Sequence, residues 1–97
     1  MLEQTFTIKN DVGLHSKVST RFISKTTNYK PSIFIEKENR RANAKSLLGV
    51  LSLGIVGGDV ITLIVEDKDE KEAIEAKKAI EELGAFINNG CIDCVYY

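Results

Sequence analysis

The sequence has few of the residues on which metal-bound, disulfide-stapled or membrane-spanning proteins depend. Its 97 residues include one histidine, one proline, two cysteines and no tryptophan. The longest apolar stretch, residues 60–65, is interrupted by Thr62 and falls far short of the roughly 20 residues that a membrane helix needs. Thirteen basic residues stand against fourteen acidic ones, so there is no general electrostatic field for nucleic acid or an anionic membrane. We therefore expect no membrane insertion and no direct nucleic-acid binding.

The two cysteines, Cys91 and Cys94, lie in the last seven residues, so a disulfide between them cannot cross-link the rest of the fold. The N-terminus shows no basic segment followed by an apolar one, so no signal peptide is expected. Together these features predict a reduced, cytoplasmic environment. The Cys-x-x-Cys spacing is also that of redox sites and half metal sites, but no second ligand pair is present. A dithiol or zinc protein is the least favoured hypothesis; an added structural segment is the preferred interpretation of this tail.

Hydrophobic patterning predicts four strands and three helices. One strand is expected over residues 2–9, and an amphipathic helix over residues 16–28 that ends before Pro31. A short apolar helix should follow Ser46 and end at Gly54, and a long helix should begin after Asp69 and end at Gly84. The remaining strands are expected at Ser32–Lys37, Arg40–Asn43 and Val60–Glu66.

The resulting β-α-β-β-α-β-α order brings strands and helices together through short connections. Such an order predicts an α+β fold in which the helices cover one face of a small, mostly antiparallel sheet. The length allows a single domain with one modest core.

His15, the only histidine, directly precedes the first predicted helix. Free backbone N–H groups and the helix dipole at that end favour an anion, so a phosphate carried by the imidazole would be stabilised there. Lys17 and Arg21 would add positive charge, and neutral imidazole is a nucleophile near pH 7. A lone histidine is more often a surface or capping residue, and metal binding is weaker still because no second histidine exists.

Two segments resemble the HPr family, the histidine phosphocarriers of the bacterial sugar phosphotransferase system. Residues 13–19 read GLHSKVS, similar to the family's G-[IL]-H-A-R-P-A motif, and residues 45–54 read KSLLGVLSLG, close to its K-S-I-M-G-V-M-S-L-G pattern. The resemblance covers residues 1–84, which we expect to form the HPr-like domain, with residues 85–97 as its C-terminal extension.

This resemblance implies an open-faced β-sandwich, a four-stranded antiparallel sheet covered on one face by three helices. It implies that His15 accepts a phosphoryl group from enzyme I and donates it to enzyme IIA proteins, as a phosphocarrier rather than an enzyme, without a cofactor or metal. It further implies that Ser46 is a regulatory site for an HPr kinase/phosphorylase. The position of Ser46 before a helix fits a phosphate independently, although a simple capping role is the alternative.

An apolar patch beside His15 is expected to receive protein partners. A short helix cannot bury all its leucines against one sheet, so part of it should stay exposed and be rimmed by polar residues of the first helix. The residues predicted to bind partners are Thr20, Arg21, Ser24, Leu47, Leu48 and Leu51.

Two residues depart from the family motif at the active site. Lys17 replaces an arginine that could grip two phosphoryl oxygens, and Val18 replaces a proline that preorganises a helix start. Both changes predict that phosphotransfer is slower, is tuned to unusual partners, or is lost. An HPr-like regulator, which binds a catabolite-control transcription factor when Ser46 is phosphorylated, is therefore the second hypothesis.

Overall fold

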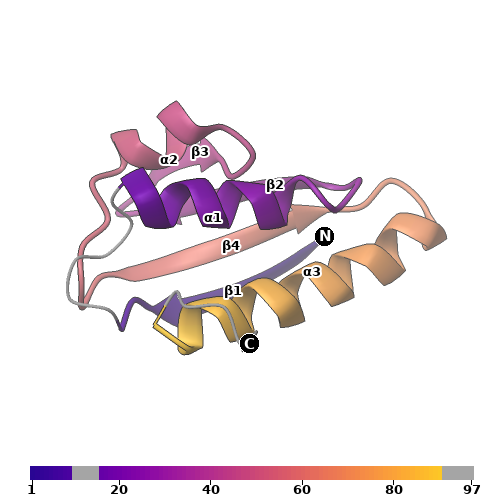
Figure 1. The fold of residues 1–97 in the computed structure, drawn as a ribbon. Coiled ribbons are helices and arrows are strands. Elements are labelled where there is room, and N and C mark those ends of the chain that lie inside the picture. Colours follow the sequence, from indigo (N-terminus) through magenta and orange to yellow (C-terminus); the bar gives the residue numbers. More distant parts are fainter. Residues whose placement is uncertain (10–15, 91–97) are drawn as a thin grey trace, which may run out of the picture.

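The computed structural model describes residues 1–9 and 16–90 and confirms the predicted order of elements. The strands are β1 (Leu2–Thr7), β2 (Ser32–Lys37), β3 (Arg40–Asn43) and β4 (Val60–Glu66). The helices are α1 (Ser16–Thr26), α2 (Leu47–Ser52) and α3 (Glu70–Asn88). The four strands form one antiparallel sheet in the order β1-β4-β2-β3. The helices lie together on one face of this sheet, with α1 between α2 and α3 (Figure 1). The predicted fold class is confirmed.

Alternation along the central strands places one set of side chains under the helices. Ile61, Leu63 and Val65 of β4 are fully buried, and the register pairs Leu63 with Ile35 of β2. Phe22 of α1 completes this core and stacks on Phe86 of α3, with 6.5 Å between ring centroids. Burial of one face of each helix against one face of the sheet is what fixes the layered arrangement.

The turn between β2 and β3 consists of Glu38 and Asn39. Both residues have positive φ, 51° and 66° respectively. Two consecutive left-handed residues are typical of the type I′ turn, whose twist matches that of the strands it joins. The hairpin therefore directs β3 along the edge of the sheet beside α2.

Three predicted ends of elements differ from the structure. β1 stops at Thr7, although Ile8 still bonds the 58–59 turn through its N–H and carbonyl groups. The first helix ends at Thr26, two residues early. The long helix does not end at Gly84 but continues to Asn88.

Gly84 was wrongly predicted as a helix end because its role is close packing. A Cβ at this position would lie 2.7 Å and 2.8 Å from two ring atoms of Phe6, which is buried on β1. The glycine therefore lets α3 approach β1, and the helix runs on without interruption.

Replacing Gly84 by alanine should destabilise the protein, although alanine has a higher helix propensity than glycine. Propensity alone would favour alanine by about 1 kcal/mol, while overpacking of a filled core costs about 1–3 kcal/mol. We expect a net loss of about 1 kcal/mol in the free energy of unfolding, measured by urea denaturation. Gly84→Ala combined with Phe6→Leu should recover part of the loss, and a more stable Gly84→Ala protein would refute the packing argument.

No helix within residues 1–9 and 16–90 has the length and hydropathy needed to cross a bilayer.

Candidate functional site: the surface formed by α1 and α2

His15 lies outside the described residues, but the helix it precedes is described from Ser16 onward. The first turn of α1 holds no acidic residue. Lys17, the second residue of the helix, has an exposed side chain. An anion next to the start of α1 would therefore meet N–H groups that have no partner within the helix and a cation, with no carboxylate in that turn to repel it.

Val18, which stands where the family motif has proline, belongs to the core. Its side chain is 9% exposed and packs with the buried cluster under the helices. Helix α1 begins at Ser16 without a proline in its first turn. Burial of Val18 therefore anchors the start of α1 by packing, which supplies part of the order that proline would provide.

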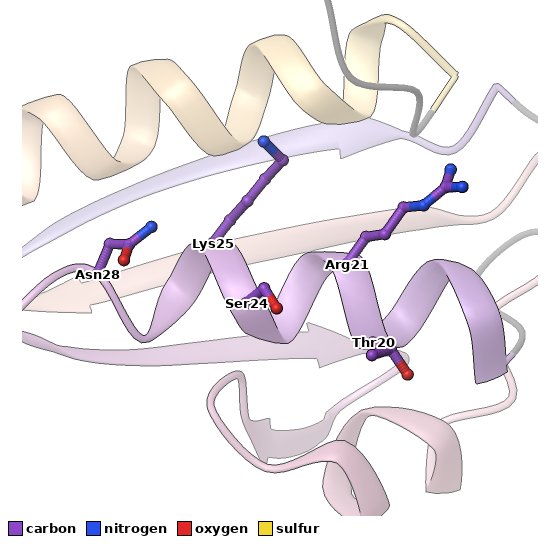
Figure 2. Close-up of a pocket in the computed structure, with 5 residues that line it drawn as sticks. All are labelled: Thr20, Arg21, Ser24, Lys25 and Asn28. Atoms are coloured by element: carbon purple, nitrogen blue, oxygen red, sulfur yellow. The ribbon is translucent and has the colours of Figure 1, made fainter. Parts of the chain in front are cut away.

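The predicted partner-binding residues of α1 lie on its exposed side. Thr20, Arg21 and Ser24 are exposed, and with Lys25 and Asn28 they line a shallow groove. Figure 2 shows Lys25 extending toward α3, where its Nζ lies 5.1 Å from the centroid of the Phe86 ring, while Thr20 lies on the side toward α2. The exposed surface of α1 is thus polar and carries three cations, Lys17, Arg21 and Lys25.

The apolar residues of α2 and its C-cap divide between core and surface, as expected. Val50 and Leu53 are buried, whereas Leu48 is 81% exposed, Leu47 is 37% exposed and Leu51 is half-buried. Helices α1 and α2 pack against each other. The structure therefore leaves the predicted partner-binding residues at least partly exposed on two neighbouring helices.

Ser46 is the N-cap of α2, as the sequence predicts. Its Oγ accepts a hydrogen bond from the N–H of Gly49 at 3.2 Å, and its own N–H donates to the carbonyl of Asn43 at 3.0 Å. A Cβ at Gly49 would lie 3.3 Å from the Ser46 Oγ. Gly49 thus keeps room beside a half-buried hydroxyl at the start of the helix.

Two residues that sequence analysis missed tie the segment before Ser46 to α1. The buried Thr26 hydroxyl lies 2.9 Å from the carbonyl oxygens of Ile23 and Ala44. The Lys45 ammonium donates to the carbonyl of Tyr29. Lys45 therefore binds the turn after α1 and not the Ser46 side chain beside it.

We expect Thr26→Val to lower the free energy of unfolding by about 2 kcal/mol, because the buried carbonyl of Ala44 loses its side-chain donor at an unchanged side-chain volume. Thr27→Val is the matched control, since its hydroxyl bonds the Ser24 carbonyl in an exposed position and should cost less than about 0.5 kcal/mol. Equal effects of the two substitutions in thermal unfolding would contradict the proposed link.

Tyr29 ties the turn after α1 to α3. Its hydroxyl donates to a carboxylate oxygen of Glu82, and the neighbouring Lys30 N–H donates to Glu75 at 3.1 Å. Burial of the ring, together with the bond to Glu82, raises the pKa of Tyr29 above its ordinary value. The phenol therefore stays protonated and keeps its role as donor.

Other candidate sites fall outside the described residues. Cys91 and Cys94 belong to residues 91–97, so the predicted redox or half-metal site is not placed. Among residues 1–9 and 16–90, no group of three or more acidic, histidine or cysteine side chains is arranged to hold a metal ion.

Comparisons with known proteins give one consistent family. Residues 2–89 match the family model described as "PTS HPr component phosphorylation site". The HPr-like protein Crh of Halalkalibacterium halodurans is 40% identical over 82 residues, covering 84% of this chain and 98% of Crh. The phosphocarrier protein HPr of Lysinibacillus sphaericus is 37% identical over 76 residues, covering 78% and 86% respectively. A crystal structure of HPr-C-His from Thermoanaerobacter tengcongensis superposes with a TM-score of 0.83 at 34% identity, covering 98% of this chain and all of that one.

Proposed function

Because this chain belongs to the HPr family of the phosphotransferase system, we propose that it carries a phosphoryl group on His15 from enzyme I to enzyme IIA proteins. The observation that carries this proposal is the place of the only histidine. It stands directly before α1, whose first turn lacks acidic residues and exposes Lys17. The protein would act in the cytoplasm and be consumed and regenerated in each cycle, so it is a carrier and not an enzyme.

The proposed transfer needs only the imidazole and an anion site. A ring nitrogen of neutral His15 attacks the phosphorus of the phosphorylated donor, the nitrogen–phosphorus bond forms, and the bond to the donor's group breaks. The N–H groups at the start of α1 and the Lys17 ammonium would then stabilise the charge on the phosphoryl oxygens. In the second transfer, a nucleophilic group of the acceptor protein attacks the phosphorus and the nitrogen–phosphorus bond to His15 breaks. This step regenerates the free imidazole.

Charge distribution supports acidic partners for the α1 and α2 surface. Between residues 16 and 53, eight residues are Lys or Arg and the only acidic ones are Glu36 and Glu38. Exposed leucines surrounded by such residues suit brief association, in which apolar contact supplies affinity and complementary charge speeds encounter. Thr20, Arg21, Ser24, Leu47, Leu48 and Leu51 would form this contact.

The test is incubation of the purified chain with enzyme I and phosphoenolpyruvate labelled in its phosphate. We expect one acid-labile, alkali-stable phosphate per chain, as a phosphoramidate requires. Label should not appear when enzyme I is omitted. Absence of label from the complete mixture would refute the carrier proposal.

Lys17→Arg should accelerate this transfer about three- to tenfold, because a guanidinium can hold two phosphoryl oxygens at once. The rate is measured by rapid quench with enzyme I at saturating phosphoenolpyruvate. Lys25→Arg, the same exchange two turns further along α1, is the control and should leave the rate unchanged. A Lys17→Arg protein no faster than the unmodified one would show that position 17 does not limit transfer.

A regulatory role through Ser46 is the second candidate function. It is favoured by the 40% identity to an HPr-like protein Crh and by the place of Ser46 as the N-cap of α2, where its hydroxyl accepts the Gly49 N–H. An HPr kinase/phosphorylase would phosphorylate Ser46, and a catabolite-control transcription factor would bind the product. A chain that takes phosphate on Ser46 from the kinase but none on His15 from enzyme I would establish this role in place of the carrier role.

A further inference from the structure

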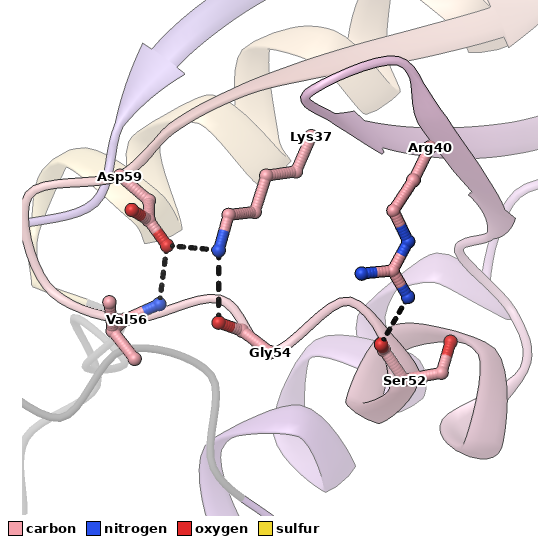
Figure 3. A network of polar contacts seen from close by, with 6 residues as sticks. All are labelled: Lys37, Arg40, Ser52, Gly54, Val56 and Asp59. Carbon is pink, nitrogen blue, oxygen red and sulfur yellow. Dashed lines mark hydrogen bonds and ion pairs between the residues drawn. The ribbon is translucent and has the colours of Figure 1, made fainter.

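The C-terminal end of α2 is held by cations from another part of the chain. Helix α2 has no basic residue in its own last turn, although the last carbonyls of a helix lack partners within it. Arg40 Nη2 donates to the Ser52 carbonyl at 2.7 Å, and Lys37 Nζ donates to the Gly54 carbonyl at 3.1 Å (Figure 3). Both residues belong to the β2–β3 hairpin, so this hairpin caps the helix.

Lys37 also fixes the loop that follows α2. Its Nζ lies 2.8 Å from Asp59 Oδ2, and the same carboxylate oxygen accepts the Val56 N–H at 2.8 Å. The side chains of Lys37 and Asp59 are only 16% and 23% exposed. The hydrogen bond from Lys37 holds the pKa of Asp59 below its ordinary value, which keeps the pair charged. One ion pair thus binds the backbone of the 54–59 loop at two points.

The placement of the two cations is unfavourable for the sheet itself. Lys37 and Arg40 are directly opposite each other in the register of the hairpin. Like charges in such a pair repel each other and destabilise the strands. Here both charges are directed at backbone carbonyls around the end of α2, which offsets the repulsion. The two cations therefore stabilise the end of α2 and do not stabilise the pairing of the strands.

Helix α2 needs such support because it is short. Six residues are too few for a helix that is stable on its own, and among them only Val50 is buried. The exposed Leu48 and Leu47 project from the same turns, so their direction depends on how firmly α2 is held.

We propose that Lys37 and Arg40, with Asp59, are positioning residues that set the orientation of α2 and thereby of its partner-binding leucines. This inference rests on the proposed function, in which α2 forms part of the surface that docks enzyme I. The three residues act through the backbone of α2 and its following loop.

The direct test is amide hydrogen exchange in α2 of the double variant Lys37→Met/Arg40→Gln. The N–H groups of Val50, Leu53 and Gly54, which bond within this segment, should exchange at least about tenfold faster than in the unmodified chain. Arg41→Gln is the matched control, because it removes a charge from the same hairpin while its guanidinium contacts Glu36 and the Phe34 ring. Unchanged exchange in the double variant would overturn the proposal.

Phosphorylation kinetics distinguish positioning from a general loss of structure. The double substitution should raise the KM of enzyme I for the chain about three- to tenfold and leave kcat within about twofold, because it weakens docking and does not slow the transfer step. A fall in kcat at constant KM would overturn the positioning role. If the unmodified chain accepts no phosphate, the proposed function fails, and the exchange measurement still decides whether α2 is held in this way.

Conservative and swapped variants supply the last control. Lys37→Arg should retain slow exchange, since a guanidinium can reach both Gly54 and Asp59. Lys37→Asp combined with Asp59→Lys should not restore it, because the Gly54 carbonyl would face a carboxylate and the Val56 N–H would lose its acceptor. Full restoration by the swapped pair would show that the ion pair alone matters and would contradict the role of the backbone contacts.

Discussion

Replacing His15 by alanine should abolish phosphate acceptance from enzyme I, with a loss of at least about a thousandfold in rate. The chain has no second histidine, so no other side chain can form the same phosphoramidate. The proposed anion site at the start of α1 would not compensate, because amides and the Lys17 ammonium would stabilise a phosphoryl group without forming a bond to phosphorus. The measurement is label retained after brief incubation with enzyme I and labelled phosphoenolpyruvate.

The control for His15→Ala is thermal unfolding together with binding to enzyme I. Both should match the unmodified chain, since the proposed docking surface consists of residues of α1 and α2. Undiminished label in His15→Ala would place the phosphate elsewhere and refute the assignment of this residue.

Introducing a negative charge at Ser46 should weaken acceptance from enzyme I about tenfold or more while the fold is retained. An aspartate at an N-cap still accepts an amide hydrogen and interacts favourably with the helix dipole, so α2 should persist. In the proposed complex, basic residues of this surface attract an acidic partner, so an added negative charge would slow the encounter. Steady-state phosphorylation of Ser46→Asp should therefore show a raised KM for enzyme I.

Ser46→Asn is the matched control, because asparagine caps the helix equally well without a charge. Its KM should equal that of the unmodified chain. If Ser46→Asn and Ser46→Asp are impaired alike, loss of the hydroxyl and not the added charge is responsible, and the regulatory interpretation is wrong.

The order of elements could be predicted because local patterns encode it. The β-prone apolar segments Ser32–Lys37 and Val60–Glu66 predict strands, which the structure confirms. Their residues Ile33, Ile35, Ile61, Leu63 and Val65 are all buried. A hydroxyl residue before an apolar run predicts an N-cap, and Ser46 is one. Such signals span a few residues and need no knowledge of distant contacts.

Gly84 shows where local patterns fail. A glycine that permits a close approach and a glycine that ends a helix look the same in sequence, and only the Phe6 ring on a distant strand distinguishes them. The contacts of Thr26, Lys37 and Arg40 were missed for the same reason. Each joins residues 12 to 22 positions apart in the sequence, and their partners are backbone carbonyls or a loop carboxylate that no side-chain pattern marks.

The proposed partner-binding surface of α1 and α2 could be predicted only in part. Exposure of Leu47 and Leu48 could be predicted from the small size of α2, and the structure confirms it. The proximity of α2 to α1 follows from the tertiary packing of the two helices. The role of these residues in docking stays a prediction, as does the division of the chain at residue 84.

The central claim, that the chain passes a phosphoryl group from one protein to another, is tested most directly by a pulse and chase. The chain is labelled through enzyme I, enzyme I and phosphoenolpyruvate are removed, and an enzyme IIA protein is added. We expect the label to leave the chain and appear on the IIA protein in equal amount, with unmodified His15 regenerated. Label that remains on the chain, or that never reaches it, would contradict the account.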